Sequence, residues 1–202
     1  MIIIIDYGMD NLRSVSKALE SLGASVKVSS NPSDVARADK LILPGVGAFP
    51  AAMRELSARK LIEPIKQAIS RGTPYLGICL GLQLLFDRSE EGESAAGLGV
   101  LAGTVKRFSL NAELKVPHMG WNQVVRSQNR CAMLEGIPDS SFVYFVHSYY
   151  ADPTDRSLVA LEADYGGRFA AMVCRDNLYA TQFHPEKSQA VGLRLLKNFV
   201  SL

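Results

Sequence analysis

A cysteine flanked by two glycines is the best candidate nucleophile in this sequence. Cys79 lies in the stretch from Tyr75 to Phe86, with Gly77 two residues before it and Gly81 two residues after it. This stretch predicts a buried strand that runs into a helix, and small residues at the junction permit a tight turn that exposes the side chain. A helix N-terminus behind the sulfur favours the thiolate, the reactive form. The alternative is a small buried apolar residue, as most cysteines outside disulfides are.

A nucleophilic cysteine needs a base, and His184 is the histidine best placed to act as one. It directly follows the apolar stretch 178–183, and Pro185 keeps it out of helical geometry at the end of a strand. Glu186 can accept the second N–H of the imidazole and so fix its tautomer. In chain order, Cys79, His184 and Glu186 form a possible catalytic triad. The alternative for His184 is a hydrogen-bonded loop histidine without a catalytic role.

The other cysteines and histidines fit structural roles. Cys174 lies in an apolar strand pattern, and Cys131 follows the polar residues 128–130. We expect His118 and His147 to be mostly structural as well. The cysteines show neither a CxxC pair nor Cys/His spacing typical of zinc ligands, which disfavours a disulfide framework and a metal site. No metal and no cofactor is therefore expected.

A cysteine nucleophile that attacks a carbonyl also needs hydrogen-bond donors for the oxyanion. The backbone N–H of Leu80 would open the helix after Cys79 and supply one donor. A second can come from the stretch Pro44–Gly47, which follows the apolar residues 41–43 and contains two glycines. In a parallel sheet both loops would lie at the same edge. The alternative is an ordinary loop, and no phosphate-binding motif matches this stretch.

Short apolar strands that alternate with amphipathic helices must position these residues. The pattern predicts an α/β fold with a mixed, mainly parallel central sheet flanked by helices. In the first half we expect strands at 2–5, 25–28, 41–43 and 75–78, with helices marked by apolar stripes at Leu12, Val15, Leu19 and Leu22 and at Leu61, Ile62, Ile65 and Ile69. In the second half we expect strands at 100–108, 142–146, 158–163, 169–175 and 178–183, a hairpin turn at Asp176-Asn177, and a helix over 189–199.

Composition limits the classes of function. With 202 residues, we expect a single domain over 1–202 with no room for a second catalytic module. The formal net charge of +2 argues against nucleic acid as a partner. Apolar runs such as Met1 to Ile5 are too short to cross a membrane, and Asp6 ends the first run before a signal peptide could form. We therefore expect a soluble, cytoplasmic chain without a membrane partner.

These motifs resemble those of a known family. Gly77-Ile-Cys-Leu-Gly81 together with His184-Pro-Glu186 resembles the class I (triad) glutamine amidotransferases, which hydrolyse glutamine to glutamate and deliver ammonia. The resemblance implies a flavodoxin-like sheet. It covers nearly the whole chain, and five further stretches narrow it to one subfamily: 6–12, 44–49, 117–122, 144–149 and 182–188. In one of them Asp10 stands where similar proteins usually have glycine.

The resemblance implies a role for each matching residue. Cys79 would be the nucleophile, His184 the general base and then acid, and Glu186 the residue that orients it. The oxyanion hole would use the N–H of Leu80 and a donor from Val46 or Gly47. The residues expected to hold glutamine are Gln83, Glu91 and the backbone at Ser148 and Tyr149.

The subfamily further implies a partner. Similar chains pass ammonia through the protein interior to a cyclase subunit with a (β/α)8-barrel fold, and are poor glutaminases without it. The expected docking face comprises Asn11, Met119, Trp121, Tyr144 and Lys187. For Trp121 the alternative is a core tryptophan, although aromatic residues are enriched at interfaces.

Other functions remain open at this point. The same chemistry could serve another amination, such as anthranilate or pyridoxal phosphate synthesis. A non-catalytic interaction module with the same fold and a hydrolase of γ-glutamyl peptides are two further alternatives.

Overall fold

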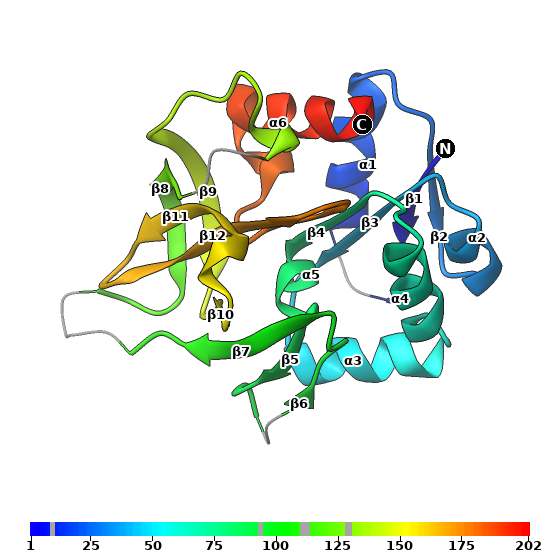
Figure 1. The fold of residues 1–202 in the computed structure, drawn as a ribbon, viewed down its shortest axis with the longest axis horizontal. Helices are drawn as coiled ribbons and strands as arrows, with labels where there is room; N and C mark the ends of the chain where they lie inside the picture. The colour runs from blue at the N-terminus through cyan, green and yellow to red at the C-terminus, as the bar shows by residue number, and fades with distance from the viewer. Residues whose placement is uncertain (9–10, 93–94, 110–113, 128–130) are drawn as a thin grey trace.

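The computed structural model describes residues 1–8, 11–92, 95–109, 114–127 and 131–202, and its centre is a mixed sheet (Figure 1). Among these residues the sheet has nine strands in the order β2-β1-β3-β4-β13-β12-β11-β8-β9. One half is parallel and consists of β1 (Ile2–Ile5), β2 (Val26–Ser29), β3 (Lys40–Gly45), β4 (Tyr75–Cys79) and β13 (Leu178–Thr181). The antiparallel half adds β12 (Arg168–Arg175), β11 (Val159–Asp164), β8 (His118–Arg126) and β9 (Ser141–His147).

A smaller sheet lies beside the central one. Its order is β10-β7-β5-β6, from β10 (Tyr149–Pro153), β7 (Leu101–Arg107), β5 (Phe86–Ser89) and β6 (Ala95–Ala96). Since β9 ends at His147 and β10 begins at Tyr149, the chain passes from one sheet to the other around Ser148. This crossing brings two residues expected to bind substrate to the boundary between the sheets.

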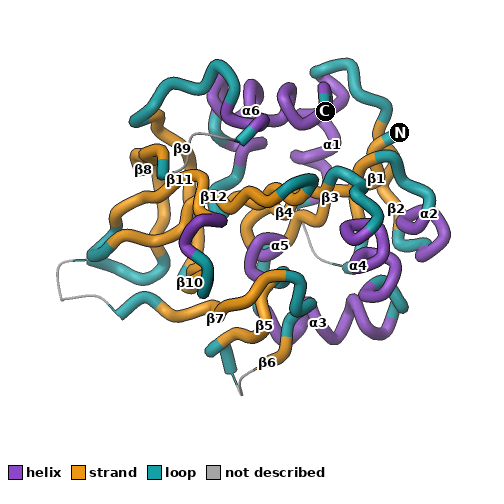
Figure 2. The backbone as a smooth tube through the Cα atoms, viewed as in Figure 1, coloured by secondary structure: helices purple, strands orange, loops and turns teal. Residues whose placement is uncertain are grey.

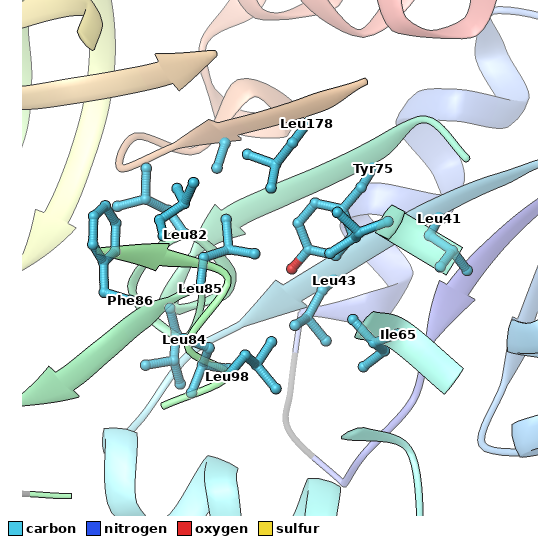
Figure 3. Packing of buried hydrophobic residues seen from close by; sticks show 14 of the residues in the cluster. Leu41, Leu43, Ile65, Tyr75, Leu82, Leu84, Leu85, Phe86, Leu98 and Leu178 are labelled. Atoms are coloured by element: carbon cyan, nitrogen blue, oxygen red, sulfur yellow. The ribbon is translucent and has the colours of Figure 1, made fainter. Parts of the chain in front are cut away.

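Helices cover both faces of the parallel half (Figure 2). On one face, α1 (Leu12–Ser21) and α6 (Gln189–Ser201) pack with Ile2 and Ile4 of β1. On the other, α2 (Pro32–Ala36), α3 (Phe49–Ala58) and α4 (Ile62–Ser70) pack with Ile3 and Ile5. Figure 3 shows part of this second core around Tyr75. Burial on both faces explains why β1 is continuously apolar.

The remaining elements are short. One-turn helix α5 (Leu80–Gln83) follows β4, and single 3₁₀ turns lie at Ala132–Leu134, Arg156–Leu158 and Pro185–Lys187. None of the helices in the described ranges combines the length and the hydrophobicity needed to cross a bilayer.

The α/β fold with a mixed sheet is confirmed, and the strand order β2-β1-β3-β4-β13 of its parallel half is the flavodoxin-like one. Parallel and antiparallel pairings are equal in number, so the sheet is less dominated by parallel strands than expected. The hairpin at Asp176 is confirmed, with Arg175 opposite Leu178 and a positive φ of 50° at Asp176.

The sequence patterns missed several elements: α2, α3, β5, β6, β8 and β10. The stretch Pro44–Gly47 was expected to be a loop that follows the strand, which is wrong for its first two residues, because Pro44 and Gly45 belong to β3. Pairing with β1 ends at Ile42, so beyond that point β3 has a neighbour on one side only, where proline is tolerated.

Candidate active site

Cys79 lies at a strained turn between β4 and α5. Its backbone has φ 54° and ψ −104°, a conformation that non-glycine residues rarely adopt. A Cβ atom on Gly81 would lie 1.8 Å from the carbonyl oxygen of Leu43, and one on Gly77 would lie 2.6 Å from the carbonyl oxygen of Gly81. The predicted need for two small residues beside the cysteine is therefore confirmed in steric terms.

Three neighbouring parallel strands bring the predicted catalytic segments to one edge of the sheet. In the register of β3 and β4, Gly45 lies opposite Cys79, so the stretch Pro44–Gly47 ends beside the cysteine. On the other side, Thr181 at the end of β13 lies opposite Ile78. His184 follows three residues later and reaches the same edge.

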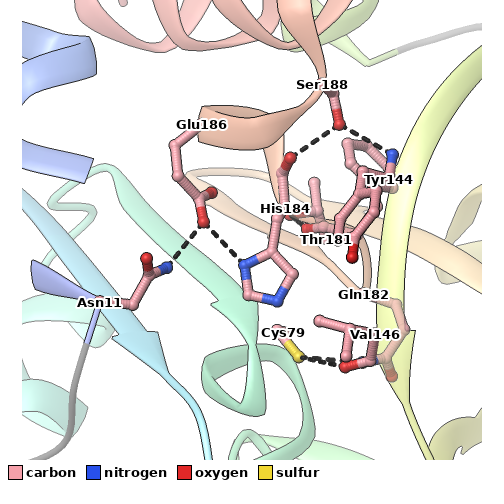
Figure 4. Close-up of polar contacts among 10 residues, drawn as sticks. Asn11, Cys79, Tyr144, Val146, Thr181, Gln182, His184, Glu186 and Ser188 are labelled. Atoms are coloured by element: carbon pink, nitrogen blue, oxygen red, sulfur yellow. Dashed lines mark hydrogen bonds and ion pairs between the residues drawn. The ribbon is translucent and has the colours of Figure 1, made fainter. Parts of the chain in front are cut away.

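His184 and Glu186 form a buried pair (Figure 4). Nδ1 of His184 lies 2.7 Å from Oε1 of Glu186, and both side chains are fully buried. Because Nδ1 faces the carboxylate, Nε2 is turned toward Cys79, and no described residue hydrogen-bonds to Nε2. The geometry brings together the three residues of the predicted triad and leaves Nε2 available for proton exchange with the sulfur.

The pKa of His184 reflects a balance of opposing effects. Burial lowers it, but contact with Cys79 and with Glu186 outweighs burial and raises the pKa to about 10. Burial likewise tends to raise the pKa of Glu186, whereas hydrogen bonds from His184 and Asn11 lower it below its usual value. Together these shifts favour a protonated His184 paired with an ionised Glu186.

A cavity of about 290 Å³ opens beside Cys79, with room for a small polar ligand. Every residue expected to form the oxyanion hole or to bind glutamine lines it. These are Val46, Gly47, Leu80, Gln83, Glu91, Ser148 and Tyr149. The cavity also contains three residues that the sequence did not single out as ligand contacts: Pro117, Val146 and His147.

Two of the substrate-binding candidates already have protein partners. Nε2 of Gln83 donates to the carbonyl oxygen of Tyr149 at 2.8 Å and to Oε1 of Gln182 at 3.1 Å. Oε2 of Glu91 accepts from the backbone N–H of Phe49 at 2.7 Å, the first residue of α3. These contacts orient both side chains at the wall of the cavity.

Several residues close to the triad were not predicted from sequence. Nε2 of Gln182 lies 3.6 Å from Sγ of Cys79, and Sγ lies 3.9 Å from the carbonyl oxygen of Val146. Asn11, expected on a docking face, also donates to Oε1 of Glu186 at 2.7 Å. Tyr7 is fully buried under Gly45, and its hydroxyl has no hydrogen-bond partner among the described residues. Gln182 and Tyr7 lie in the stretches 182–188 and 6–12 that carry the family resemblance, but nothing in the sequence assigned either side chain a role.

His118 and His147 face each other across β8 and β9 and are buried, as expected for structural histidines. Nδ1 of His118 lies 2.9 Å from Nε2 of His147. Burial lowers the pKa of His118 to about 4 and that of His147 to about 3. Both rings are therefore neutral near pH 7.

Three of the five expected docking residues, Met119, Trp121 and Tyr144, lie on the outward face of β8 and β9, whereas Asn11 precedes α1 and Lys187 lies in the turn Pro185–Lys187. Met119 and Trp121 expose 63% and 47% of their surface, which contradicts the alternative of a core tryptophan. Trp121 lies opposite Tyr144, with ring centroids 6.1 Å apart. Phe142, which was not predicted, is also exposed, and Lys187 is exposed beside Glu186.

Two expectations concern other parts of the chain. Asp10 lies outside the described residues. Within the described part of the chain, no group of three or more His, Cys, Asp or Glu side chains is arranged to hold a metal ion.

Comparisons with known proteins agree with this geometry. The family model described as glutamine amidotransferase class-I matches residues 3–202. The chain is 55% identical to the imidazole glycerol phosphate synthase subunit HisH of Syntrophotalea carbinolica, over 98% of both chains. It is 54% identical to the subunit of the same name from Rhodopirellula baltica, over 100% of this chain and 97% of the relative. A crystal structure of a glutamine amidotransferase superposes over the full length of both chains with a TM-score of 0.76 and 19% identity.

Proposed function

Because the chain belongs to the class-I glutamine amidotransferases, we propose that it is the glutaminase subunit of an imidazole glycerol phosphate synthase, in histidine biosynthesis. The observation that carries this proposal is the placement of Cys79, His184 and Glu186 at one sheet edge, beside a cavity. The subunit would hydrolyse glutamine and pass the ammonia to a cyclase subunit.

The triad can perform both halves of the hydrolysis. The sulfur of Cys79 attacks the carboxamide carbon of glutamine, and a tetrahedral oxyanion forms. As the C–N bond breaks, Nε2 of His184 gives its proton to the nitrogen, which leaves as ammonia, and a γ-glutamyl thioester remains. Water then attacks the thioester while His184 takes its proton; the C–S bond breaks, glutamate is released, and Cys79 and the protonated His184 are regenerated. Glu186 keeps His184 in the required tautomer throughout.

Backbone donors would stabilise the oxyanion in both steps. The N–H of Leu80 follows the nucleophile directly, and Val46 or Gly47 would supply the second donor from the end of β3. One missing donor in such a hole typically slows catalysis by about 10² to 10³. Loss of the donor from Val46 or Gly47 would therefore slow glutamine hydrolysis by a factor of this size.

The remaining cavity residues would select glutamine. Gln83 and Glu91 provide acceptor oxygens, which suit the amide N–H groups and the α-ammonium group of the substrate. The backbone at Ser148 and Tyr149 would hold the α-carboxylate. A cavity lined by few polar groups in fixed orientations is typical of a small-molecule site.

The outward face of β8 and β9 would dock the cyclase, a (β/α)8 barrel. Its apolar residues Met119, Trp121 and Phe142 fit an interface core, and Tyr144 lies opposite Trp121. Lys187 is exposed one residue before Ser188, whose Oγ accepts from the N–H of Tyr144. Val146 pairs with Met119 in the same ladder and also lines the cavity, so the docking face continues into the proposed glutamine site.

Passage of ammonia between the subunits would avoid its loss to protonation and diffusion in water. The cyclase would combine ammonia with N′-(5′-phosphoribulosyl)formimino-AICAR ribonucleotide and release imidazole glycerol phosphate and AICAR. We propose a location in the cytoplasm, where free thiols such as that of Cys79 stay reduced.

A reconstitution experiment tests this function. The chain is mixed with a purified barrel cyclase, and glutamine-dependent formation of imidazole glycerol phosphate is measured, with an anthranilate synthase component as the control partner. We expect a stable complex and product only with the cyclase, and little glutamine hydrolysis by the chain alone. Complex formation with the anthranilate component instead would support the rival amination function, and a chain that hydrolyses no glutamine with any partner would support a non-catalytic module.

A further inference from the structure

The main-chain carbonyl of Tyr149 fixes the orientation of two side chains at the cavity. It accepts a hydrogen bond from Nε2 of Gln83 at 2.8 Å and lies 2.9 Å from Nδ1 of His147. Because a carbonyl oxygen only accepts, both of these nitrogen atoms must carry a hydrogen. The amide orientation of Gln83 and the tautomer of His147 follow from this one atom.

Gln83, the first of these two side chains, is linked to the nucleophile through Gln182. The second amide hydrogen of Gln83 points to Oε1 of Gln182, 3.1 Å away. The amide nitrogen of Gln182 is therefore turned the other way, toward Sγ of Cys79 at 3.6 Å. Gln182 is fully buried, so no water competes for its amide hydrogens. The donor directed at the sulfur is thus held by an ordered chain of contacts.

His147, the second of these side chains, forms a pair with His118 that holds the carbonyl of Tyr149 in place. Since Nδ1 of His147 donates to Tyr149, its Nε2 must accept in the neutral ring, and Nδ1 of His118 lies 2.9 Å from that atom. Nε2 of His118 is then the acceptor for Nδ2 of Asn122 at 3.3 Å. Burial keeps the pKa of both rings well below 7, so this donor pattern persists at neutral pH.

We propose that Gln182 is a positioning residue for Cys79: it donates an amide hydrogen to the sulfur, favours the thiolate and directs it toward the cavity. The neutral pair His118 and His147 holds the carbonyl of Tyr149, and this carbonyl sets the orientation of the Gln182 amide. A neutral donor of this kind favours the anion without adding a charge. The consequence for catalysis rests on the proposed glutaminase function, but the contact with the sulfur can be tested without glutamine.

Other titratable groups also lie near Cys79. His184 contacts it directly, and the buried hydroxyl of Tyr7 lies close enough to interact with it. Glu91 and His147 line the same cavity. Substitutions of Gln182 leave these four groups in place, so a change in reactivity of the sulfur reports on the amide itself.

The test is the pH dependence of Cys79 alkylation by iodoacetamide in the full-length chain, with the modified peptide identified by mass. In Gln182→Met the amide is lost at similar length, and we expect the pH midpoint of alkylation to rise by about one unit. In Gln182→Glu the acceptor for Gln83 remains but a carboxylate faces the sulfur, and we expect a larger rise. The matched control is Gln67→Met, on the exposed surface of α4. Unchanged midpoints in either folded Gln182 variant overturn the proposal.

A second measurement uses the unaltered protein. Nitrogen-15 NMR at pH 7 should show His118 and His147 neutral and protonated at Nδ1, and a proton at Nε2 of His147 instead would overturn the proposed orientation. The outcomes also separate this inference from the proposed function. A shifted alkylation midpoint in a chain that hydrolyses no glutamine supports the role of Gln182 and contradicts the glutaminase; an unchanged midpoint in an active glutaminase contradicts only the role of Gln182.

Discussion

Nδ2 of Asn11 donates to Oε1 of Glu186 at 2.7 Å, and the same oxygen accepts from Nδ1 of His184 at 2.7 Å. The carboxylate is therefore held by two donors from opposite ends of the chain, while its other oxygen has no partner among the described residues. Asn11 precedes α1 and reaches the triad directly, so the start of the first helix takes part in orienting the base.

Substitution of Asn11 should weaken the triad without removing any of its members. We expect Asn11→Ala to lower glutaminase kcat in the assembled complex by a factor of about 10 to 150, because one hydrogen bond to a charged group contributes about 1.5 to 3 kcal/mol. Asn11→Asp should lower glutaminase kcat further, because it places a second carboxylate against Glu186. Synthesis from added ammonium salts serves as the control for docking and should stay near the wild-type rate. Wild-type glutaminase activity in Asn11→Asp would contradict this role.

The neutral histidine pair should make the fold sensitive to acid. The folded-state pKa values, about 4 for His118 and about 3 for His147, lie below the usual 6.5. The folded state is therefore favoured by its neutral rings above pH 6.5, and this contribution to the free energy of unfolding is lost as pH falls toward the folded-state values. When pH falls from 7.5 to 5, each of the two rings should lower the free energy of unfolding by about 2 kcal/mol.

The raised pKa of His184 acts in the opposite direction, so the effect of the pair must be measured as a difference. His118→Asn keeps a donor near the position of Nδ1 and removes one titrating ring. We expect its loss of stability between pH 7.5 and pH 5 to be about 2 kcal/mol smaller than that of the wild type, in urea unfolding at both pH values. Equal losses in both proteins would show that His118 is not held neutral.

The hydroxyl of Tyr7 is buried without a described partner, and burial raises the pKa of this residue far above its usual value. Removal of an unsatisfied buried polar group stabilises a fold by about 1 kcal/mol or more. Tyr7→Phe should therefore raise the melting temperature while glutamine hydrolysis persists. Loss of hydrolysis in a stable Tyr7→Phe protein would instead assign the hydroxyl a part in the reaction.

Gly81 allows the one-turn helix to pack against β3. A Cβ atom there would approach the carbonyl oxygen of Leu43 to 1.8 Å, so Gly81→Ala should cost about 3 kcal/mol or more by overpacking. Gly72 provides the comparison, because nothing lies within 4 Å of its Cβ position and only its φ of 89° is unfavourable for alanine. Gly72→Ala should cost about 1 kcal/mol. Equal costs in denaturant unfolding would contradict the steric argument.

The sequence predicted those parts of the site that local patterns encode. Cys79 between two glycines and His184 before Pro185 are recognisable because a strand that ends in a tight turn leaves a short, specific signature. Strands β1, β3, β4 and β13 are buried on both faces, so their continuous apolar runs were also visible.

Contacts between distant segments could not be predicted in the same way. Asn11 and Glu186 are 175 positions apart, and Gln182 and Cys79 are 103 apart, so no spacing rule links them. Strand β8 was missed because its solvent-facing side carries Met119 and Trp121, which interrupts the usual alternation of apolar and polar residues. Helix α3 was missed because glycines and Pro50 mark its start as a turn.

The most direct test of the proposed mechanism is Cys79→Ala in the complex with the cyclase. The account predicts that glutamine-dependent formation of imidazole glycerol phosphate is abolished, because no other thiol lines the cavity, while formation from added ammonium salts continues at the wild-type rate. Undiminished glutamine hydrolysis in Cys79→Ala would contradict the account.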